Sequence, residues 1–162
     1  MRSDLLNSNS NALSLIEAGA TSCLKQTVSF TADSASIASG AMVIPKDAVI
    51  TKLVAVVNVA LAYASATLGV KAGSAAAGAQ FMALDADGLA ASATSLAAGK
   101  GVSTFDEYTT ALGGAVAHDL VANSAKVGAG TEVHFTTVAS TGAFTAGSMT
   151  YIVEYISLDD NV

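Results

Sequence analysis

The chain has 162 residues, a length that suits one domain with a sizeable hydrophobic core. Hydrophobic residues make up 52% of the sequence and charged residues only 12%, whereas soluble domains typically carry about 25% charged residues. The net charge is −6 and Lys and Arg form no cluster, which argues against a nucleic-acid partner, because such binding needs a basic surface to displace counterions.

The pattern indicates neither a membrane segment nor a secretion signal. The longest apolar run, 53–64, is interrupted by Asn58 and is shorter than the roughly 20 residues of a membrane helix. The N-terminus lacks the continuous apolar core of a signal peptide. We therefore expect a soluble protein made in the cytoplasm, with no membrane partner. Cys23 is the single cysteine, so no intrachain disulfide can form, and we expect it to be a small buried hydrophobe.

Residues 1–22 are expected to form an extended N-terminal arm outside the domain. Ser and Asn dominate residues 7–11, which favours turns and loops. The amphipathic piece that follows is too short to be a stable helix alone, so a partner surface would have to order it. The predicted partner-binding residues of the arm are Leu5, Leu6, Leu13, Leu15 and Ile16.

After Cys23 the apolar residues recur with a period of two, which predicts strands. The first, 24–30, places Leu24, Gln26, Val28 and Phe30 on one face. A second covers 36–45 and ends at the only proline. The strongest covers 47–63, and its residues alternate between two faces: Val49, Thr51, Leu53, Ala55, Val57, Val59 and Leu61 on one, and Ile50, Lys52, Val54, Val56, Asn58 and Ala60 on the other. Both of its faces are largely apolar, as in a central strand covered on both sides.

Further strands are predicted at 66–73, 79–88, 115–122, 131–140 and 146–158, and residues 89–114 are interpreted as a long surface excursion. Eight or nine short strands with almost no helix predict an all-β fold: a β-sandwich or jelly-roll-like single domain over residues 23–162. A parallel α/β fold is not indicated, because it needs crossover helices of a dozen or more residues.

Asp85, Asp87 and Gly88 form the only acidic pattern that resembles a calcium loop. Positions five and twelve of an EF-hand counted from Asp85 are Leu89 and Leu96, which supply no side-chain oxygen ligand. Asp-Gly after a strand is a turn signature, so a structural turn is favoured. The sequence leaves open whether the two aspartates pick up a cation.

No catalytic, cofactor-binding or metal-binding set can be assembled, so we expect a protein that is not an enzyme and holds no cofactor. The two histidines lie in separate predicted strands. His118 and Asp119 are adjacent, so a strand would point them to opposite faces. Glu132 and His134 share a face, but zinc would need a third ligand that the sequence does not supply.

The densest charged and aromatic segment is Phe105, Asp106, Glu107 and Tyr108, within the predicted excursion. It is a candidate binding loop. Alternatively, the two aromatic residues anchor the loop and the acids are exposed.

Three segments carry a resemblance to small virion proteins of tailed bacteriophages: "IPKDAVITKLVAVVNVALA", "ATLGVKAG" followed by "FMALDADGLAAS", and "FTAGSMTYIVEYI". The resemblance covers roughly residues 43–156. It implies a structural role, most directly as a capsid decoration (cement) protein on the outer surface of the head, made in the host cytoplasm. The implied partners are the major capsid protein and further copies of the chain, as a homotrimer.

A tail, head-fibre or receptor-binding component is the alternative. A glycan-binding module of that kind needs exposed aromatic residues near polar ones, and the only candidates are Tyr63 and the segment 105–108.

Overall fold

The computed structural model describes residues 21–30, 35–45, 48–82, 90–103 and 131–157, and this part of the chain is built of strands without a helix. All strand pairs are antiparallel. The prediction of an all-β, sandwich-like single domain is confirmed. The strands are β1 (Thr21–Ser29), β2 (Ser36–Ala38), β3 (Met42–Val43), β4 (Ala48–Gly73), β5 (Ala90–Leu96), β6 (Gly101–Ser103), β7 (Glu132–Ala139) and β8 (Phe144–Ser157).

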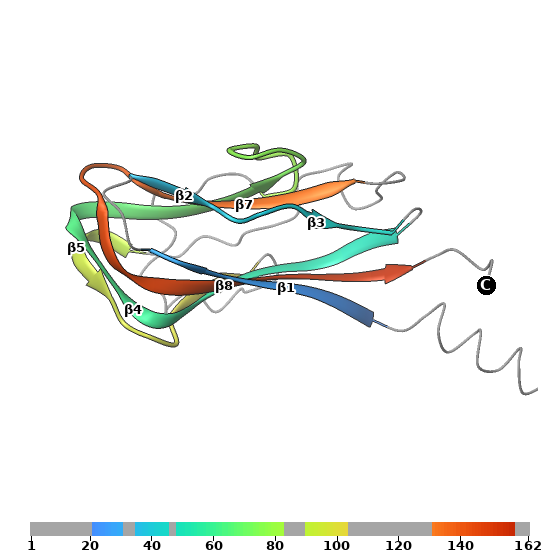
Figure 1. Cartoon of the computed structure of the whole chain (residues 1–162), viewed down its shortest axis with the longest axis horizontal. Coiled ribbons are helices and arrows are strands. Elements are labelled where there is room, and N and C mark those ends of the chain that lie inside the picture. The colour runs from blue at the N-terminus through green and yellow to red at the C-terminus, as the bar shows by residue number, and fades with distance from the viewer. Residues whose placement is uncertain (1–20, 31–34, 46–47, 83–89, 104–130, 158–162) are drawn as a thin grey trace, which may run out of the picture.

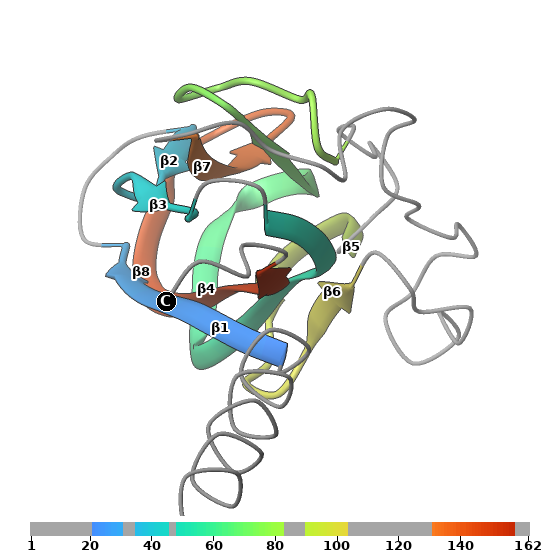
Figure 2. The same ribbon diagram turned by 90° about the vertical axis from the view of Figure 1, so that its right-hand side faces the viewer.

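The strands lie in two layers because β4 belongs to both (Figure 1). The hydrogen-bonded order is β1-β8-β4-β7-β2, with β3 also paired to β7 and with β5 and β6 paired to β4. The first part of β4 pairs with β8, whereas Leu68–Gly73 pairs with β7 in the other layer. In the end view, β5 and β6 lie on the opposite side of the molecule from β2 and β3 (Figure 2).

Strand β4 was predicted as two strands, 47–63 and 66–73, and the structure joins them into one strand of 26 residues. Its pairing with β8 shifts register between Ile50 and Lys52 and again between Val57 and Tyr63. Such irregularities bend a strand and increase its twist. The bends carry β4 from one layer to the other without a turn, which is why no turn residue marks the crossing.

The first register shift also changes which residues of β4 face the core. Ile50 pairs with Tyr155 and Lys52 with Glu154, so Thr51 is an extra residue. Ala48 and Ile50 are therefore buried with Leu53, so the buried face changes from one predicted face to the other across Thr51. Farther along the strand, Val59 is 60% exposed, whereas the other members of its face are buried: Leu53, Ala55, Val57 and Leu61. On the opposite face Val54 and Val56 are only half-buried, so the expected cover on both sides is not found in the described part of the chain.

The alternation predicted for the first strand is confirmed. In β1, Leu24 and Val28 pack against the core, Gln26 is half-buried and Phe30 is fully buried, while Lys25, Thr27 and Ser29 are exposed. In β8, Met149, Tyr151 and Val153 are fully buried.

The expectation that Cys23 is buried is wrong, because Cys23 is exposed. It lies on the outer side of β1, between Ser22 and Leu24, where no second layer covers it.

Other predicted segments also differ from the strands that the structure shows. The segment 89–114, interpreted as a surface excursion, contains β5 and β6, and both pair with β4. Its Ala, Ser and Gly residues lack the β-branched side chains that predict a strand. They form strands because their backbones pair with β4. The predicted strand 79–88 is described only to Met82, which forms a single bridge with Ala72. The predicted strand 36–45 is divided into β2 and β3.

Several predicted segments lie outside the described residues: the strand 115–122, the turn at Asp85–Gly88 and most of the N-terminal arm. Strand β1 begins at Thr21, so it includes the last two residues that were assigned to the arm.

Aromatic residues fill two regions of the core between the layers. Phe144 contacts Phe30 and Tyr63, with ring centroids 4.8 and 6.0 Å apart. Phe135 stacks on Tyr151 at 5.0 Å. Each pair joins side chains from different strands, and such aromatic contacts add about 0.5–1.5 kcal/mol beyond the area they bury.

Candidate interaction surfaces

The described strands carry little charge. The described residues contain four lysines (Lys25, Lys52, Lys71 and Lys100) and two glutamates (Glu132 and Glu154), a net charge of +2 with His134 neutral, against −6 for the whole chain. The other eleven acidic residues lie outside the described part. The strand surfaces therefore exert little long-range repulsion on a neighbouring protein.

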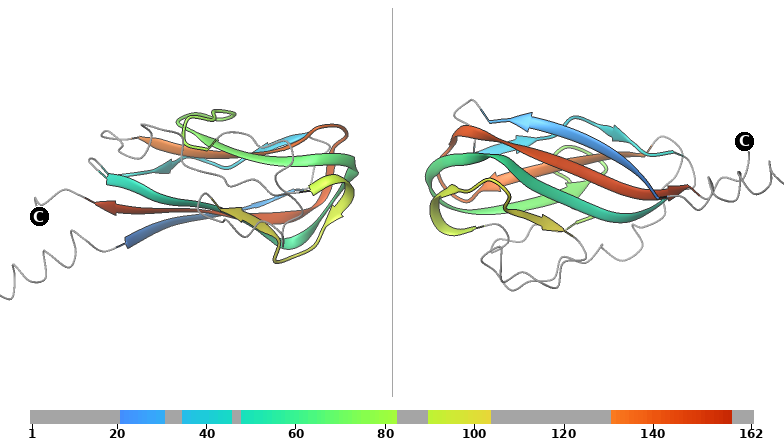
Figure 3. Two further views of the ribbon diagram at one scale, coloured as in Figure 1. Left: turned by 180° about the vertical axis from the view of Figure 1, so that it is seen from behind. Right: turned by 90° about the horizontal axis from the view of Figure 1, so that it is seen from below.

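The outer face of the β1-β8-β4 layer combines apolar and hydroxyl side chains. Pairing places Val54 beside Ile152, and both are half-buried. Next to them, Thr150 Oγ1 lies 2.8 Å from Thr27 Oγ1 and accepts a hydrogen bond from Asn58 Nδ2. The view from below shows this layer in the order β1, β8, β4 (Figure 3). Hydrogen-bonded hydroxyls are already satisfied, so covering this face would leave few polar groups unpaired.

Among the described residues, two large hydrophobic side chains are exposed: Val43 on β3 at 56% and Val59 on β4 at 60%. Val59 lies where β4 shifts register, with Asn58 and Ala60 also exposed. This exposure is not predictable from the sequence, because Val59 stands in the longest apolar run. Single exposed valines are ordinary at protein surfaces, and each becomes informative only beside a matching partner.

The loop Ser74–Gln80 folds back against β7. The backbone N–H of Ala77 donates to Thr136 Oγ1 at 3.1 Å, and Gln80 Oε1 accepts from the N–H of Ser74 at 3.2 Å. Ala77 has a φ of 63°, a conformation that costs a non-glycine residue about 1–2 kcal/mol. The position of the loop over β7 depends on contacts between residues far apart in the sequence.

Glu132 and His134 form the one predicted polar pair that lies within the described residues. His134 Nε2 is 2.9 Å from Glu132 Oε2, and both belong to the outer side of β7. The shared face predicted from the sequence is confirmed. No group of three or more His, Cys, Asp or Glu that could hold a metal ion is found where the structure is described.

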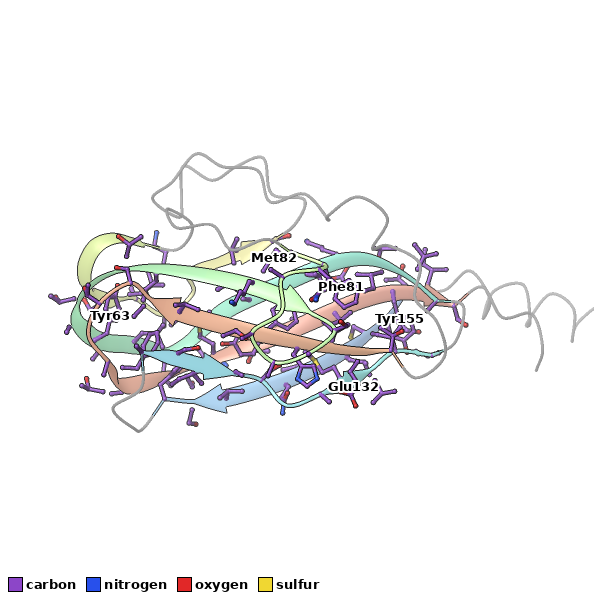
Figure 4. The ribbon with its side chains drawn as sticks, turned by 90° about the horizontal axis from the view of Figure 1, so that it is seen from above. Tyr63, Phe81, Met82, Glu132 and Tyr155 are labelled. Atoms are coloured by element: carbon purple, nitrogen blue, oxygen red, sulfur yellow. The ribbon has the colours of Figure 1, made fainter. Side chains whose placement is uncertain are left out.

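Tyr63, a candidate for glycan contact, is not available for that role. The side chain is only 5% exposed and its ring packs edge-on against Phe144. Figure 4 places Tyr63 near the end of the sandwich opposite to Tyr155. Burial raises the pKa of the Tyr63 hydroxyl, which has no hydrogen-bond partner.

The remaining predicted site residues lie outside the described part of the chain. They are the arm residues Leu5, Leu6, Leu13, Leu15 and Ile16, the loop residues Phe105, Asp106, Glu107 and Tyr108, the turn residues Asp85 and Asp87, and His118 with Asp119. Their roles stay predictions. In the described ranges, no helix is long and apolar enough to cross a membrane.

Comparison with known proteins finds structural similarity only. No family model matches the sequence, and no curated protein matches it. Two solved structures resemble the fold over 86% of this chain and 86% of their own. One is from the cyanophage Pam1 capsid asymmetric unit, 17% identical with a TM-score of 0.48, and the other from the capsid of Ralstonia phage GP4, 15% identical with a TM-score of 0.42.

Proposed function

We propose that this chain is a structural protein of a tailed-phage virion, and that it decorates the outer surface of the head as a cement protein. The observation that carries the proposal is the surface of the described part of the sandwich, which has six formal charges and whose outer residues are mainly Ala, Ser, Thr and Val. Such a surface can be covered by a neighbouring protein at a small desolvation cost. The sequence resemblance to phage virion proteins supports the same role.

In this proposal the major capsid protein is the principal partner. The arm reaches onto the capsid, and Leu5, Leu6, Leu13, Leu15 and Ile16 supply its apolar contacts. An arm loses conformational entropy when it is ordered, and its contacts have to offset that loss. Repetition over a symmetric shell, with the copies grouped as homotrimers, makes weak contacts effective together.

The arm's role can be tested on a truncated protein that keeps the sandwich intact. Because β1 begins at Thr21, the truncation removes residues 1–20 and leaves every described strand in place. The truncated protein should fold with an unchanged circular-dichroism spectrum. Its binding to purified heads of the phage that encodes it, measured by co-sedimentation, should fall by at least about tenfold, as expected when about 1.4 kcal/mol of binding free energy is lost.

A second variant separates the apolar side chains of the arm from its length: it replaces Leu13, Leu15 and Ile16 by Ser in the full-length chain. This variant keeps the length of the arm and removes only apolar side chains, so it should bind as weakly as the truncation. Undiminished binding of both variants would exclude the arm as the capsid contact. If the full-length protein does not bind to the heads at all, the decoration role itself is contradicted.

A further inference from the structure

Strand β1 lies at the edge of the sheet that the structure describes. In the described part of the chain it pairs only with β8, over nine consecutive residue pairs without a register shift. Figure 3, seen from below, shows β1 outermost in its layer, beside β8. A strand in this position presents unpaired backbone groups along its whole length.

The hydrogen-bond pattern identifies which backbone groups are unpaired. The N–H of Phe30 donates to the carbonyl of Gly147 at 2.8 Å, so Phe30 faces β8. Because residues of an antiparallel pair alternate between the two sides, the even-numbered residues of β1 bond to β8. The N–H and C=O groups of the odd-numbered residues, Thr21, Cys23, Lys25, Thr27 and Ser29, point outward from the sheet.

The devices that usually protect such an edge are mostly missing. Strand β1 contains no proline and no bulge, and Lys25 is its only charge. Natural proteins normally blunt a long free edge with prolines, bulges, charges or a covering segment. A regular, nearly neutral edge of nine residues is suited to accept another strand.

We propose that β1 pairs with β1 of a second copy of this chain, antiparallel about a two-fold axis at Gln26. In this register Cys23 lies opposite Ser29 of the second copy, and Lys25 opposite Thr27. Leu24 lies opposite Val28, so both half-buried apolar side chains of the edge gain an apolar neighbour. A two-fold axis at Lys25 would instead place two lysines directly opposite each other, which is destabilising.

Gln26 supplies a second observation in favour of this axis. Its side chain lies over Gly40, and its Oε1 atom is buried without a hydrogen-bond partner. On the axis, Gln26 of the second copy would form a non-hydrogen-bonded pair with it, with Cα atoms about 4.5 Å apart. A rotation of the Gln26 amide toward the second copy would let the orphaned oxygen, which is enclosed in the single chain, accept from the amide N–H groups of that copy.

A two-fold contact of this kind goes beyond decoration of the capsid by separate molecules. It is isologous, so it closes a dimer and cannot by itself build a trimer. Together with a homotrimer it would link neighbouring trimers. A single pair of strands makes a small interface, so the contact is expected to be weak in solution and to strengthen where many copies are held side by side.

Disulfide trapping tests the register in the full-length chain. Gln26→Cys in a Cys23→Ser background places two thiols on the axis, where the expected Cα separation of about 4.5 Å fits a disulfide. Ser74→Cys in the same background is the control, since Ser74 is exposed on a loop away from β1. Under a glutathione buffer the first variant should form dimers at least about tenfold faster, because pairing raises the effective thiol concentration.

Thr27→Pro provides the second test, because it removes an outward N–H without disturbing the bonds to β8. Thr27→Ala is its matched control, since both changes remove the hydroxyl that contacts Thr150. Added to the Gln26→Cys variant, Thr27→Pro should reduce the rate of disulfide trapping to that of Ser74→Cys. Introduced alone into the native chain, Thr27→Pro should abolish the dimers seen by sedimentation velocity near millimolar concentration. Thr27→Ala should have neither effect.

Either of two results would overturn the proposal: trapping at position 26 no faster than at position 74, or dimers that persist unchanged with Thr27→Pro. A thermal-unfolding scan of each variant confirms that the comparison is made on folded protein. If Gln26→Cys does not fold, the sedimentation comparison of the Pro and Ala variants decides alone, and a native protein that stays monomeric near millimolar concentration would refute the pairing.

Discussion

At the scale of single residues, two threonines show how differently the fold treats a buried hydroxyl. Thr137 Oγ1 lies 2.7 Å from Tyr151 Oη and 3.5 Å from the sulfur of Met149, and Thr137 and Tyr151 are both fully buried. Thr51, the extra residue in β4, has a buried Oγ1 without a partner. A buried hydroxyl without a hydrogen bond costs about 1–3 kcal/mol, whereas a paired one contributes stability.

The same substitution should therefore have opposite effects at the two positions. Thr51→Val is expected to stabilise the fold by about 1 kcal/mol, because it removes an unsatisfied hydroxyl and keeps the β-branched shape. Thr137→Val should destabilise it by about 1–2 kcal/mol, because Tyr151 is left with a weak sulfur acceptor. Urea unfolding at neutral pH measures both, and a loss of stability with Thr51→Val would contradict the assignment of the bulge.

The buried Tyr151 hydroxyl also makes stability depend on alkaline pH. Burial raises its pKa to about 12, from an ordinary value of 10.0, although the hydrogen bond with Thr137 acts in the opposite direction. Between these values the unfolded chain loses the proton and the folded chain keeps it. The contribution is therefore complete below pH 10 and is lost as the pH rises toward 12, by up to about 1.4 kcal/mol per pH unit.

Tyr151→Phe has no proton to lose at this position, which makes it the reference for the pH measurement. The difference in unfolding free energy between the native chain and Tyr151→Phe should be constant below pH 10 and should shift against the native chain above it. Urea titrations at several values between pH 8 and 11.5 would measure this difference. Parallel pH profiles would show that the hydroxyl is not buried as described.

At the scale of elements, the sequence predicts regular strands well and irregular ones poorly. The period-two pattern of the first strand placed Leu24, Val28 and Phe30 on one side, and all three face the core, because β1 pairs with β8 without a register shift. In β4 the alternation is regular from Leu53 to Val57, where the register is continuous. Before this stretch the buried face is the opposite one, and after it Val59 is exposed. A bulge inverts the alternation on one side of itself, and Thr51 is not distinguished in the sequence from the other β-branched residues around it.

One glycine shows how the strands accommodate the bend of β4. Gly147 in β8 has a φ of 120°, and a Cβ at this position would lie 2.6 Å from the Leu61 side chain and 2.7 Å from the Ala60 carbonyl oxygen. Both strain and steric overlap therefore oppose any side chain there. The close approach lies beside the irregular stretch of the β4–β8 pairing.

Gly147→Ala should destabilise the protein by about 2 kcal/mol or more, since it combines backbone strain with overpacking. Gly99→Ala is the matched control: Gly99 also has a positive φ, of 82°, but a Cβ there meets nothing within 4 Å. Its cost should be limited to backbone strain, about 1–2 kcal/mol. Thermal unfolding of the two variants compares them, and an equal loss would mean that β8 does not approach β4 closely at Gly147.

At the scale of the whole molecule, composition and periodicity were enough for the fold class but not for the topology. Frequent strands, few charges and the lack of helical patterns led to a two-layer β fold. The crossing of β4 between layers and the pairing of β5 with β4 depend on residues far apart in the sequence. Small residues such as those of β5 have no strong preference for strand structure. Their pairing with β4 is therefore evident only in the assembled fold.

The candidate surfaces were still less predictable. The outward backbone groups of β1 are a property of the sheet edge and have no residue type of their own, and the orphaned oxygen of Gln26 becomes visible only when β1 lies beside Gly40. By contrast, the shared face of Glu132 and His134 followed directly from their spacing along one strand.

The number and position of copies in the virion test the proposed role most directly. Quantitative mass spectrometry against the major capsid protein would give the copy number, and electron cryomicroscopy of the particle would give the position. We expect copies close in number to the capsid subunits, on the outer face of the head. Only a few to a few tens of copies, located in the tail, fibre or neck, would contradict decoration, and the segment Phe105–Tyr108 would then be the first to examine for receptor binding.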